Sequence, residues 1–219
     1  MNASSEPVRL KITEIFFSLQ GEADTTGIPT VFVRLTGCPL RCQYCDTAYA
    51  FHGGAWYSID EVLAEVRRHQ TRYVCVTGGE PLAQRTCLTL LTRLCDEGFR
   101  VSLETSGALD VTVVDPRVVR VVDIKTPGSR ESESNRLENL ADLRATDQLK
   151  FVICDRTDYD WSRRFVVEHE LIGRCPILFS PSHEQLKAVE LADWILADHV
   201  PVRMQIQLHK YLWGNVPGK

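Results

Sequence analysis

Short apolar runs rich in β-branched residues alternate with amphipathic helical patterns along most of this chain. Strands separated by helices pair in parallel through right-handed crossovers and are buried on both faces. The strand-like runs are residues 30–37, 73–79, 100–107, 118–125, 148–154, 176–182 and 202–209. The helical patterns are residues 58–69, 82–97, 158–171 and 184–198.

The length limits how far such a sheet can close. A complete (β/α)8 barrel takes about 250 residues, whereas this chain has 219 and uses residues 8–19 for a preceding extended segment. No linker or internal repeat divides the chain. We therefore expect one α/β domain spanning residues 1–219, a partial (β/α) barrel of about six parallel strands. The polar stretch 126–135 is interpreted as a solvated loop.

Composition excludes several kinds of partner. There are 25 Lys and Arg against 29 Asp and Glu, a net charge of −4. No basic excess therefore indicates direct binding to nucleic acid or to an anionic membrane. No apolar run approaches the roughly 20 residues of a membrane span, and residues 1–11 lack the apolar core of a signal peptide. We expect a cytoplasmic protein with a small-molecule ligand.

Residues suited to chemistry follow the ends of the predicted strands. These motifs are the cysteine cluster after 30–37, TGGEP at 77–81, ETSG at 104–107, DIK at 123–125, FSPSH at 179–183 and QLHK at 207–210. In parallel α/β folds the carboxyl ends of the strands share one rim, where ligands bind. The motifs are therefore predicted to face one site.

Cys38, Cys42 and Cys45 form a CxxxCxxC motif in this eight-cysteine chain. A structural zinc site takes four ligands, and no second CxxC or His pair is present. An iron–sulfur cluster held by three cysteines would leave one iron open to another ligand. Incidental clustering of reduced thiols, or zinc with a distant histidine, remains the alternative. The other five cysteines are predicted to be buried, inert thiols.

With TGGEP in the second strand, this triplet resembles the radical S-adenosylmethionine (SAM) superfamily. The resemblance implies a [4Fe–4S] cluster whose open iron binds SAM. Gly78 and Gly79 would let the backbone approach that ligand, and Glu80 could pair with a cationic group.

The flanking motifs resemble one family more specifically, the 7-carboxy-7-deazaguanine synthases. They are SLQGE at 18–22, FVRLTGCPLRCQYCDT at 32–47, TGGEPLAQ at 77–84, DIKTPGS at 123–129, LKFVI at 149–153 and QLHKYLWG at 207–214. The resemblance runs from about residue 12 to 214. It implies conversion of 6-carboxytetrahydropterin into 7-carboxy-7-deazaguanine with loss of ammonia, in queuosine and 7-deazapurine biosynthesis. A [4Fe–4S] cluster, SAM and Mg²⁺ would be the cofactors.

The resemblance also implies roles for individual residues. Thr47 would be a ligand of Mg²⁺, a cation that prefers oxygen donors. Arg34 would bind the substrate carboxylate as a planar fork, the alternative being a surface arginine on an edge strand. The other substrate-binding residues would be Leu19, Gln20, Gly21, Glu22, Thr77 and His209. A purely structural role is the alternative for His209.

The SAM side would include Tyr44 beside the adenine and Gly79 at the edge of the second strand. The remaining SAM-binding candidates are Cys45, Asp46, Glu80, Asp123, Ile124, Lys125, Ser180, Pro181, Ser182 and His183. A plain surface charge pair is the alternative for Asp123 with Lys125, and a turn that begins a helix is the alternative for 180–183.

The implied reaction begins with reductive cleavage of SAM, and the resulting deoxyadenosyl radical abstracts hydrogen from pterin C6. A flavodoxin or ferredoxin would supply the electron, the protein would be a homodimer, and residues 202–219 would cap the substrate. No protein acid or base is assigned, and a contact from the Lys219 carboxylate is left open. An activase of glycyl-radical enzymes and a non-catalytic iron–sulfur module are the alternatives. The latter would need four protein ligands per cluster.

Overall fold

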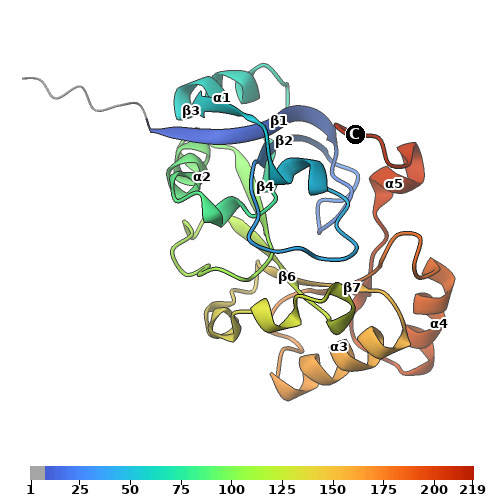
Figure 1. Ribbon diagram of the computed structural model, residues 1–219. Coiled ribbons are helices and arrows are strands. Elements are labelled where there is room, and N and C mark those ends of the chain that lie inside the picture. The colour runs from blue at the N-terminus through green and yellow to red at the C-terminus, as the bar shows by residue number, and fades with distance from the viewer. Residues whose placement is uncertain (1–7) are drawn as a thin grey trace, which may run out of the picture.

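Nine strands join in one continuous sheet in the computed structural model, which describes residues 8–219 (Figure 1). Their order is β3-β1-β2-β4-β5-β6-β7-β8-β9. The strands are β1 (Arg9–Leu19), β2 (Pro29–Leu35), β3 (Ala55–Ser58), β4 (Tyr73–Gly78), β5 (Arg100–Thr105), β6 (Val119–Ile124), β7 (Gln148–Ile153), β8 (Ile177–Pro181) and β9 (Arg203–Met204). Residues 1–7, the start of the predicted domain and most of the stretch considered for a signal peptide, lie outside the described part.

The parallel part of the sheet runs from β2 through β4 to β9, and β1 pairs antiparallel with both β2 and β3. Six of the parallel strands have five or more residues, whereas β9 has only two. The prediction of a partial barrel of about six parallel strands is therefore confirmed. The extended segment 8–19 is β1, which covers one edge of β2.

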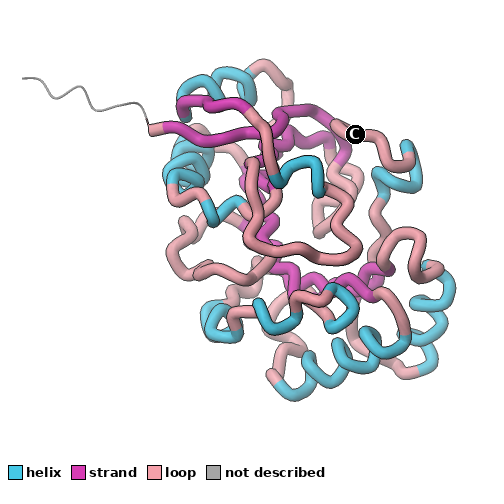
Figure 2. The backbone as a smooth tube through the Cα atoms, in the orientation of Figure 1, coloured by secondary structure: helices cyan, strands magenta, loops and turns pink. Residues whose placement is uncertain are grey.

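Helices lie outside the curved sheet, which occupies the middle of the molecule (Figure 2). They are α1 (Ile59–Arg67), α2 (Thr86–Asp96), α3 (Arg156–Glu168) and α4 (Ala188–Ala197). The short α5 (Leu208–Trp213) lies instead at the carboxyl ends of the strands, where its His209 and Lys210 line a cavity. Helix α1 begins at a capping box, in which Ser58 and Glu61 each accept a hydrogen bond from the other's backbone N–H. Helix α2 begins at Thr86 rather than at residue 82, because Pro81–Ala83 forms a separate 3-10 turn capped by Glu80.

Two apolar cores hold the helices on the sheet. One packs α1 and α2 against β2 and β4 through residues such as Val33, Val76 and Leu91. The other packs α3 and α4 against β7 and β8, with Phe151 and Phe179 at its centre. Because these cores lie on the outer face, the inner face of the sheet is free to carry polar side chains.

Two further local predictions are wrong, and one strand was missed. The run 202–209 is not one strand, since only Arg203–Met204 pairs with β8 and α5 begins at Leu208. Between them, the Gln205 side chain makes two 2.9 Å hydrogen bonds with the Ala23 backbone and draws the chain toward the loop after β1. The edge strand β3 was not anticipated. Residues 126–135 form two 3-10 turns, and the side chains of Thr126 and Ser129 are fully buried rather than solvated.

None of the helices formed by residues 8–219 combines the length and the apolar character needed to cross a bilayer.

Candidate active site

A cavity of about 640 Å³ lies at the carboxyl ends of the parallel strands. Each of the six longer parallel strands contributes to its wall, through Arg34, Thr77, Thr105, Asp123, Lys150 and Ser180. A second cavity of about 160 Å³ adjoins it and is also lined by Arg34, Thr77 and Lys150. The predicted convergence of the strand-end motifs on one site is therefore found.

Cys38, Cys42 and Cys45 line the larger cavity from the loop after β2. Partial burial raises the pKa of the Cys38 thiol and raises that of Cys42 to about 11. Within residues 8–219, no group of three or more His, Cys, Asp or Glu side chains is placed to hold a single metal ion. A cluster does not need convergence on one point, since each thiolate binds a different iron.

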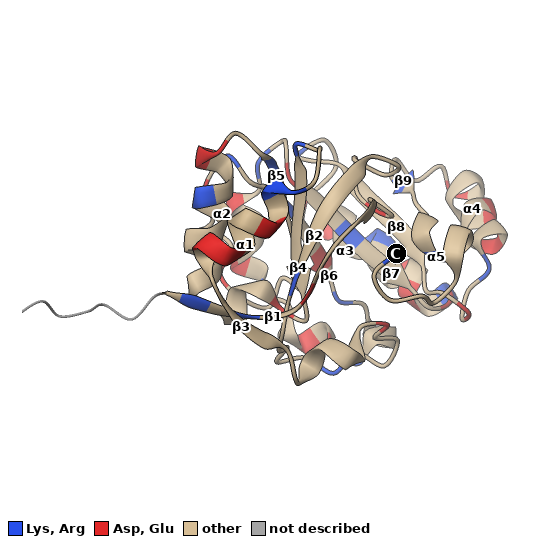
Figure 3. Ribbon diagram, turned by 90° about the horizontal axis from the view of Figure 1, so that it is seen from above, with Lys and Arg blue, Asp and Glu red and all other residues tan. Residues whose placement is uncertain are grey.

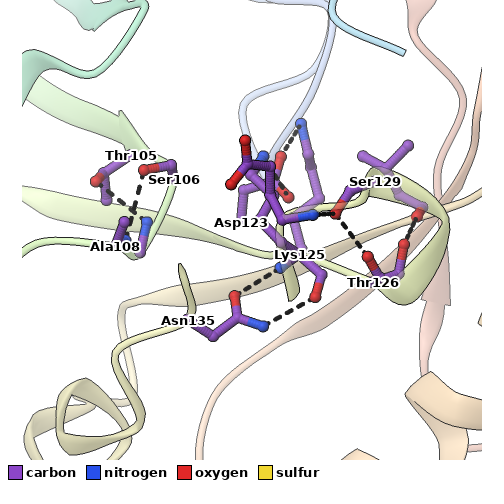
Figure 4. A network of polar contacts seen from close by, with 12 residues as sticks. Thr105, Ser106, Ala108, Asp123, Lys125, Thr126, Ser129 and Asn135 are labelled. Carbon is purple, nitrogen blue, oxygen red and sulfur yellow. Dashed lines mark hydrogen bonds and ion pairs between the residues drawn. The ribbon is translucent and has the colours of Figure 1, made fainter. Parts of the chain in front are cut away.

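The segment 126–135 supports this cysteine loop. The backbone N–H of Gln43 donates to the Ser129 carbonyl at 3.1 Å, and that of Arg41 donates to a Glu131 carboxylate oxygen at 2.6 Å. The Asn135 amide both accepts from the Lys125 N–H and donates to the Lys125 carbonyl, each at 2.8 Å (Figure 4). The segment therefore connects the cysteine loop to the end of β6.

Gly78 and Gly79 are required by backbone contact. A Cβ at Gly79 would lie 2.3 Å from the Gly37 carbonyl oxygen, and one at Gly78 would lie 2.6 Å from that of Leu35. Both distances are too short for any side chain, so these glycines let the end of β4 approach the end of β2 and the start of the cysteine loop. Both also line the larger cavity, where the backbone is open to a ligand.

Glu80 differs from its predicted position facing a cationic ligand. Its carboxylate is fully buried and accepts hydrogen bonds from Thr105 Oγ1, from the Ser106 backbone and hydroxyl, and from the Leu82 backbone. It does not line either cavity. Glu80 therefore joins the end of β4 to the end of β5.

The residues predicted for the SAM side surround the larger cavity, except Glu80 and Ile124. Ile124 is buried in the outer core instead. Lys125 Nζ lies 3.2 Å from Asp123 and both side chains are at least four-fifths buried, so the pair is not on the surface. Residues 180–183 also line the cavity, and Asp46 forms a 2.6 Å ion pair with Lys210.

The cavity fits the two groups that the cysteine motif implies. Three thiols open onto it, and its volume lies within the 300–1,000 Å³ range of small-molecule sites. The Tyr44 hydroxyl is buried at its wall without a hydrogen-bond partner in residues 8–219, and its burial raises the pKa of the phenol. Such an unpaired polar atom is uncommon in a folded protein and marks a place for a ligand.

The residues predicted for the substrate line the smaller cavity. Gly21 makes room for His209, since a Cβ there would lie 2.1 Å from the imidazole Nδ1. Burial lowers the pKa of His209 and favours its neutral form. Gln20 and Thr77 both donate to Glu104, at 3.3 and 3.0 Å. Leu19 and Glu22 complete this wall.

Arg34 lies on β2 between β1 and β4, and therefore not on an edge strand. Its Nε donates to Glu14 at 2.7 Å, and the same carboxylate oxygen accepts from the Tyr49 hydroxyl at 2.8 Å. This arrangement holds the guanidinium through Nε, and Arg34 lines both cavities. Thr47 lines both cavities, with its hydroxyl 3.7 Å from the Cys45 sulfur.

Sequence reasoning missed several residues of the site. Lys150 contacts the carboxylate of Glu22, and Gln207 donates to the other oxygen of Glu22 at 2.7 Å. Glu14 and Tyr49 were also missed. Lys150 interrupts the apolar run LKFVI, and that was the one signal that could have identified it. The C-terminal residues 214–219 line the larger cavity, and Lys219 also lines the smaller one.

Comparison with known proteins identifies the class first. The family model described as Radical SAM superfamily matches residues 32–122, which contain the cysteine motif and β4. SuiB from Streptococcus suis, solved bound to S-adenosylmethionine, shares the fold with a TM-score of 0.55 at 12% identity over 78% of this chain and 45% of that one. The chain is a radical SAM enzyme, and this class implies a [4Fe–4S] cluster and SAM.

The particular family follows from longer matches. The 7-carboxy-7-deazaguanine synthase of Chlorobaculum tepidum is 45% identical over 94% of each chain, and that of Koribacter versatilis is 43% identical over 93% of this chain and 97% of its own. The crystal structure of QueE from Escherichia coli has a TM-score of 0.76 at 25% identity, covering 94% of this chain and all of that one. The chain belongs to the 7-carboxy-7-deazaguanine synthase family.

Proposed function

We propose that this enzyme converts 6-carboxy-5,6,7,8-tetrahydropterin into 7-carboxy-7-deazaguanine, a ring contraction that releases ammonia. The observation that carries the proposal is the pair of adjoining cavities. One is lined by the three cysteines, and the other carries Arg34, Gln20 and Glu22. A member of this family needs both a radical source and a pterin site. The two cavities that would hold them are lined in part by the same residues, among them Arg34, Thr77 and Lys150.

The cysteines would hold three irons of the cluster, with the fourth open to the amino and carboxylate groups of SAM. Together the two groups supply a carbon-centred radical that removes hydrogen from substrate C6. Tyr44 would contact the adenine with its ring, and Asp123, Lys125 and residues 180–183 would bind the rest of SAM. Glu80 would act indirectly, by holding β4 and β5 together behind the cavity, and Ile124 through its core packing.

The substrate would be oriented by polar groups fixed before it binds. Arg34 would take its carboxylate, and Gln20, Glu22 and His209 would hydrogen-bond the pterin ring. Thr77 and the Leu19–Gly21 segment would complete the pocket, and residues 202–219 would cover it. Because Arg34, Glu22 and Thr77 are hydrogen-bonded within the protein, little reorganisation of these groups accompanies binding.

Thr47 would be the protein ligand of a Mg²⁺ ion that steers the rearrangement through the substrate carboxylate. A hydroxyl suits a cation that keeps several waters and shares substrate oxygens. The position of Thr47 on the wall between the two cavities supports this role. We further propose a flavodoxin or ferredoxin as reductant, a homodimeric assembly and a cytoplasmic location.

The alternatives find less support. An activase would share the cysteine motif but not the motifs that match over 94% of a synthase chain. A non-catalytic iron–sulfur module would not need a second cavity lined by Arg34 and His209.

Anaerobic turnover tests the proposal. Cluster-reconstituted protein would be supplied with SAM, Mg²⁺, a reductant and 6-carboxytetrahydropterin, and the products identified by mass spectrometry. The proposal predicts 7-carboxy-7-deazaguanine, and its loss in Cys38→Ala. Formation of deoxyadenosine alone would show that the radical chemistry is right and the substrate wrong.

A further inference from the structure

Lys150 occupies a position that none of the proposed binding roles explains. It lies on β7, its side chain is 12% exposed, and it lines both cavities. Its Nζ contacts the Glu22 carboxylate and lies 3.4 Å from Asp123 Oδ2. Asp123 is the cross-strand partner of Lys150 on β6, whereas Glu22 follows β1. One ammonium therefore touches a carboxylate of each proposed ligand site.

The surroundings make this ammonium hard to replace. Glu22, Asp46, Glu104 and Asp123 all line the cavities, and Figure 3 shows acidic and basic segments together at the centre of the molecule. A buried carboxylate stays ionised only when it is paired or well hydrogen-bonded. Asp123 also has Lys125, and Asp46 has Lys210. The only cation in contact with Glu22 among residues 8–219 is Lys150.

A role for Lys150 as a proton carrier fits poorly. Burial opposes its protonation, but the negative charges of Glu22 and Asp123 outweigh that effect and raise its pKa above the ordinary value for lysine. The side chain therefore remains an ammonium at all working pH values, and its contribution is charge and geometry.

We propose that Lys150 is a positioning residue that holds Glu22 on the substrate side and Asp123 on the SAM side in one ionised arrangement. The ligand for Glu22 is then one that presents N–H donors, as the edge of an aminopyrimidinone ring does. This inference rests on the proposed function for the identity of that ligand. Removing the single charge of Lys150 should therefore weaken the binding of both the substrate and SAM.

A double-mutant cycle on substrate binding tests whether Lys150 acts through Glu22. Lys150→Met, Glu22→Gln and the double variant would be titrated anaerobically with 6-carboxytetrahydropterin, in reconstituted protein holding SAM, by calorimetry. Removing one partner of a buried ion pair should weaken binding at least about tenfold in each single variant. If Lys150 acts through Glu22, the double variant should bind within about twofold of the weaker single variant. Losses that multiply would overturn the inference.

The double variant also guards against misfolding. Lys150→Met leaves an unpaired buried carboxylate, whereas the double variant removes both charges and is expected to fold more readily. Lys187→Met, at the exposed N-terminus of α4, is the matched control. Far-ultraviolet circular dichroism and iron content would be compared across the set.

Whether Lys150 also acts through Asp123 is tested by measuring the binding of SAM alone, which does not depend on the pterin. Lys150→Met should weaken SAM binding about tenfold, again non-additively with Asp123→Asn. Unchanged SAM affinity in Lys150→Met would overturn the inference. If wild-type protein failed to bind the pterin, the proposed function would fall, and the SAM cycle would still decide the role of Lys150.

Discussion

Arg34 shows how a single residue can be fixed before its ligand arrives. Glu14 holds Nε, so the terminal nitrogens remain for a bidentate contact with the substrate carboxylate. Lysine keeps the charge but not the planar fork. We expect Arg34→Lys to raise the KM for 6-carboxytetrahydropterin about 10- to 100-fold, with a smaller effect on kcat. Arg100→Lys, at the opposite end of the strands, is the control; an unchanged KM in Arg34→Lys would remove Arg34 from the substrate site.

The lowered pKa of Glu22 predicts how the free energy of unfolding depends on pH. Burial alone would raise the pKa of Glu22, but the charge of Lys150 and the hydrogen bonds from Lys150 and Gln207 outweigh it, and the pKa is lowered. The unfolded value is about 4.3. The ionised carboxylate therefore stabilises the fold above that pH, and this contribution is lost as the pH falls through the folded pKa.

Denaturant unfolding between about pH 3 and 6 measures this effect. The free energy of unfolding should fall less steeply with acid in Glu22→Gln than in wild type. Glu133→Gln, an exposed glutamate, should follow wild type. Parallel curves for Glu22→Gln and wild type would show that Glu22 is not held ionised by the fold.

At the scale of elements, the segment 126–135 links the cysteine loop to β6. Asn135→Asp keeps the acceptor for the Lys125 N–H but places a carboxylate oxygen against the Lys125 carbonyl. We expect this variant to weaken SAM binding about tenfold, since a hydrogen bond is replaced by repulsion. Glu133→Ala in the same segment is the control. Equal SAM affinity in Asn135→Asp and wild type would show that the segment 126–135 does not contribute to SAM binding.

The elements that the sequence predicted are those defined by local pattern. Apolar β-branched runs gave the six longer parallel strands, and the Ser58–Glu61 capping box located α1. The errors arose where distant contacts decide the conformation. Gln205 ends the last strand by bonding to Ala23, far away in the chain, and Asn135 orders a polar stretch through Lys125. Neither partner can be read from a local window.

For the molecule as a whole, the carboxyl ends of the parallel strands carry the candidate active site, whereas their amino ends contribute to stability. At the amino ends of β6 and β7, the fully buried Arg120 pairs with the fully buried Asp147 at 2.5 Å. Asp147→Asn should lower the free energy of unfolding by about 3–5 kcal/mol, because the buried arginine then keeps only the partly exposed Asp142 carboxylate, 2.6 Å away, as a counter-charge. Asp142→Asn, whose side chain is 46% exposed, should cost under about 1 kcal/mol.

Denaturant titration of both variants measures these costs, and activity per folded molecule should stay at the wild-type level. Equal stability of Asp147→Asn and wild type would contradict the assignment of this end to folding.

The candidate site was predictable where single side chains carry the chemistry. The cysteines line the larger cavity, and Arg34 and His209 line both cavities, as their motifs indicated. Glu80 was placed wrongly because its motif does not reveal that Thr105 and Ser106 occupy its carboxylate. Lys150 was missed because its role depends on contacts with the Glu22 and Asp123 carboxylates, which come close to it only in the folded protein.

We expect the radical source and substrate C6 to meet where the two cavities adjoin. The most direct test is anaerobic turnover with 6-carboxytetrahydropterin deuterated at C6, followed by mass spectrometry of the adenosyl products. We predict deuterium in 5′-deoxyadenosine or in re-formed SAM. Turnover that leaves both unlabelled would contradict the claim, because hydrogen would then not pass directly from C6.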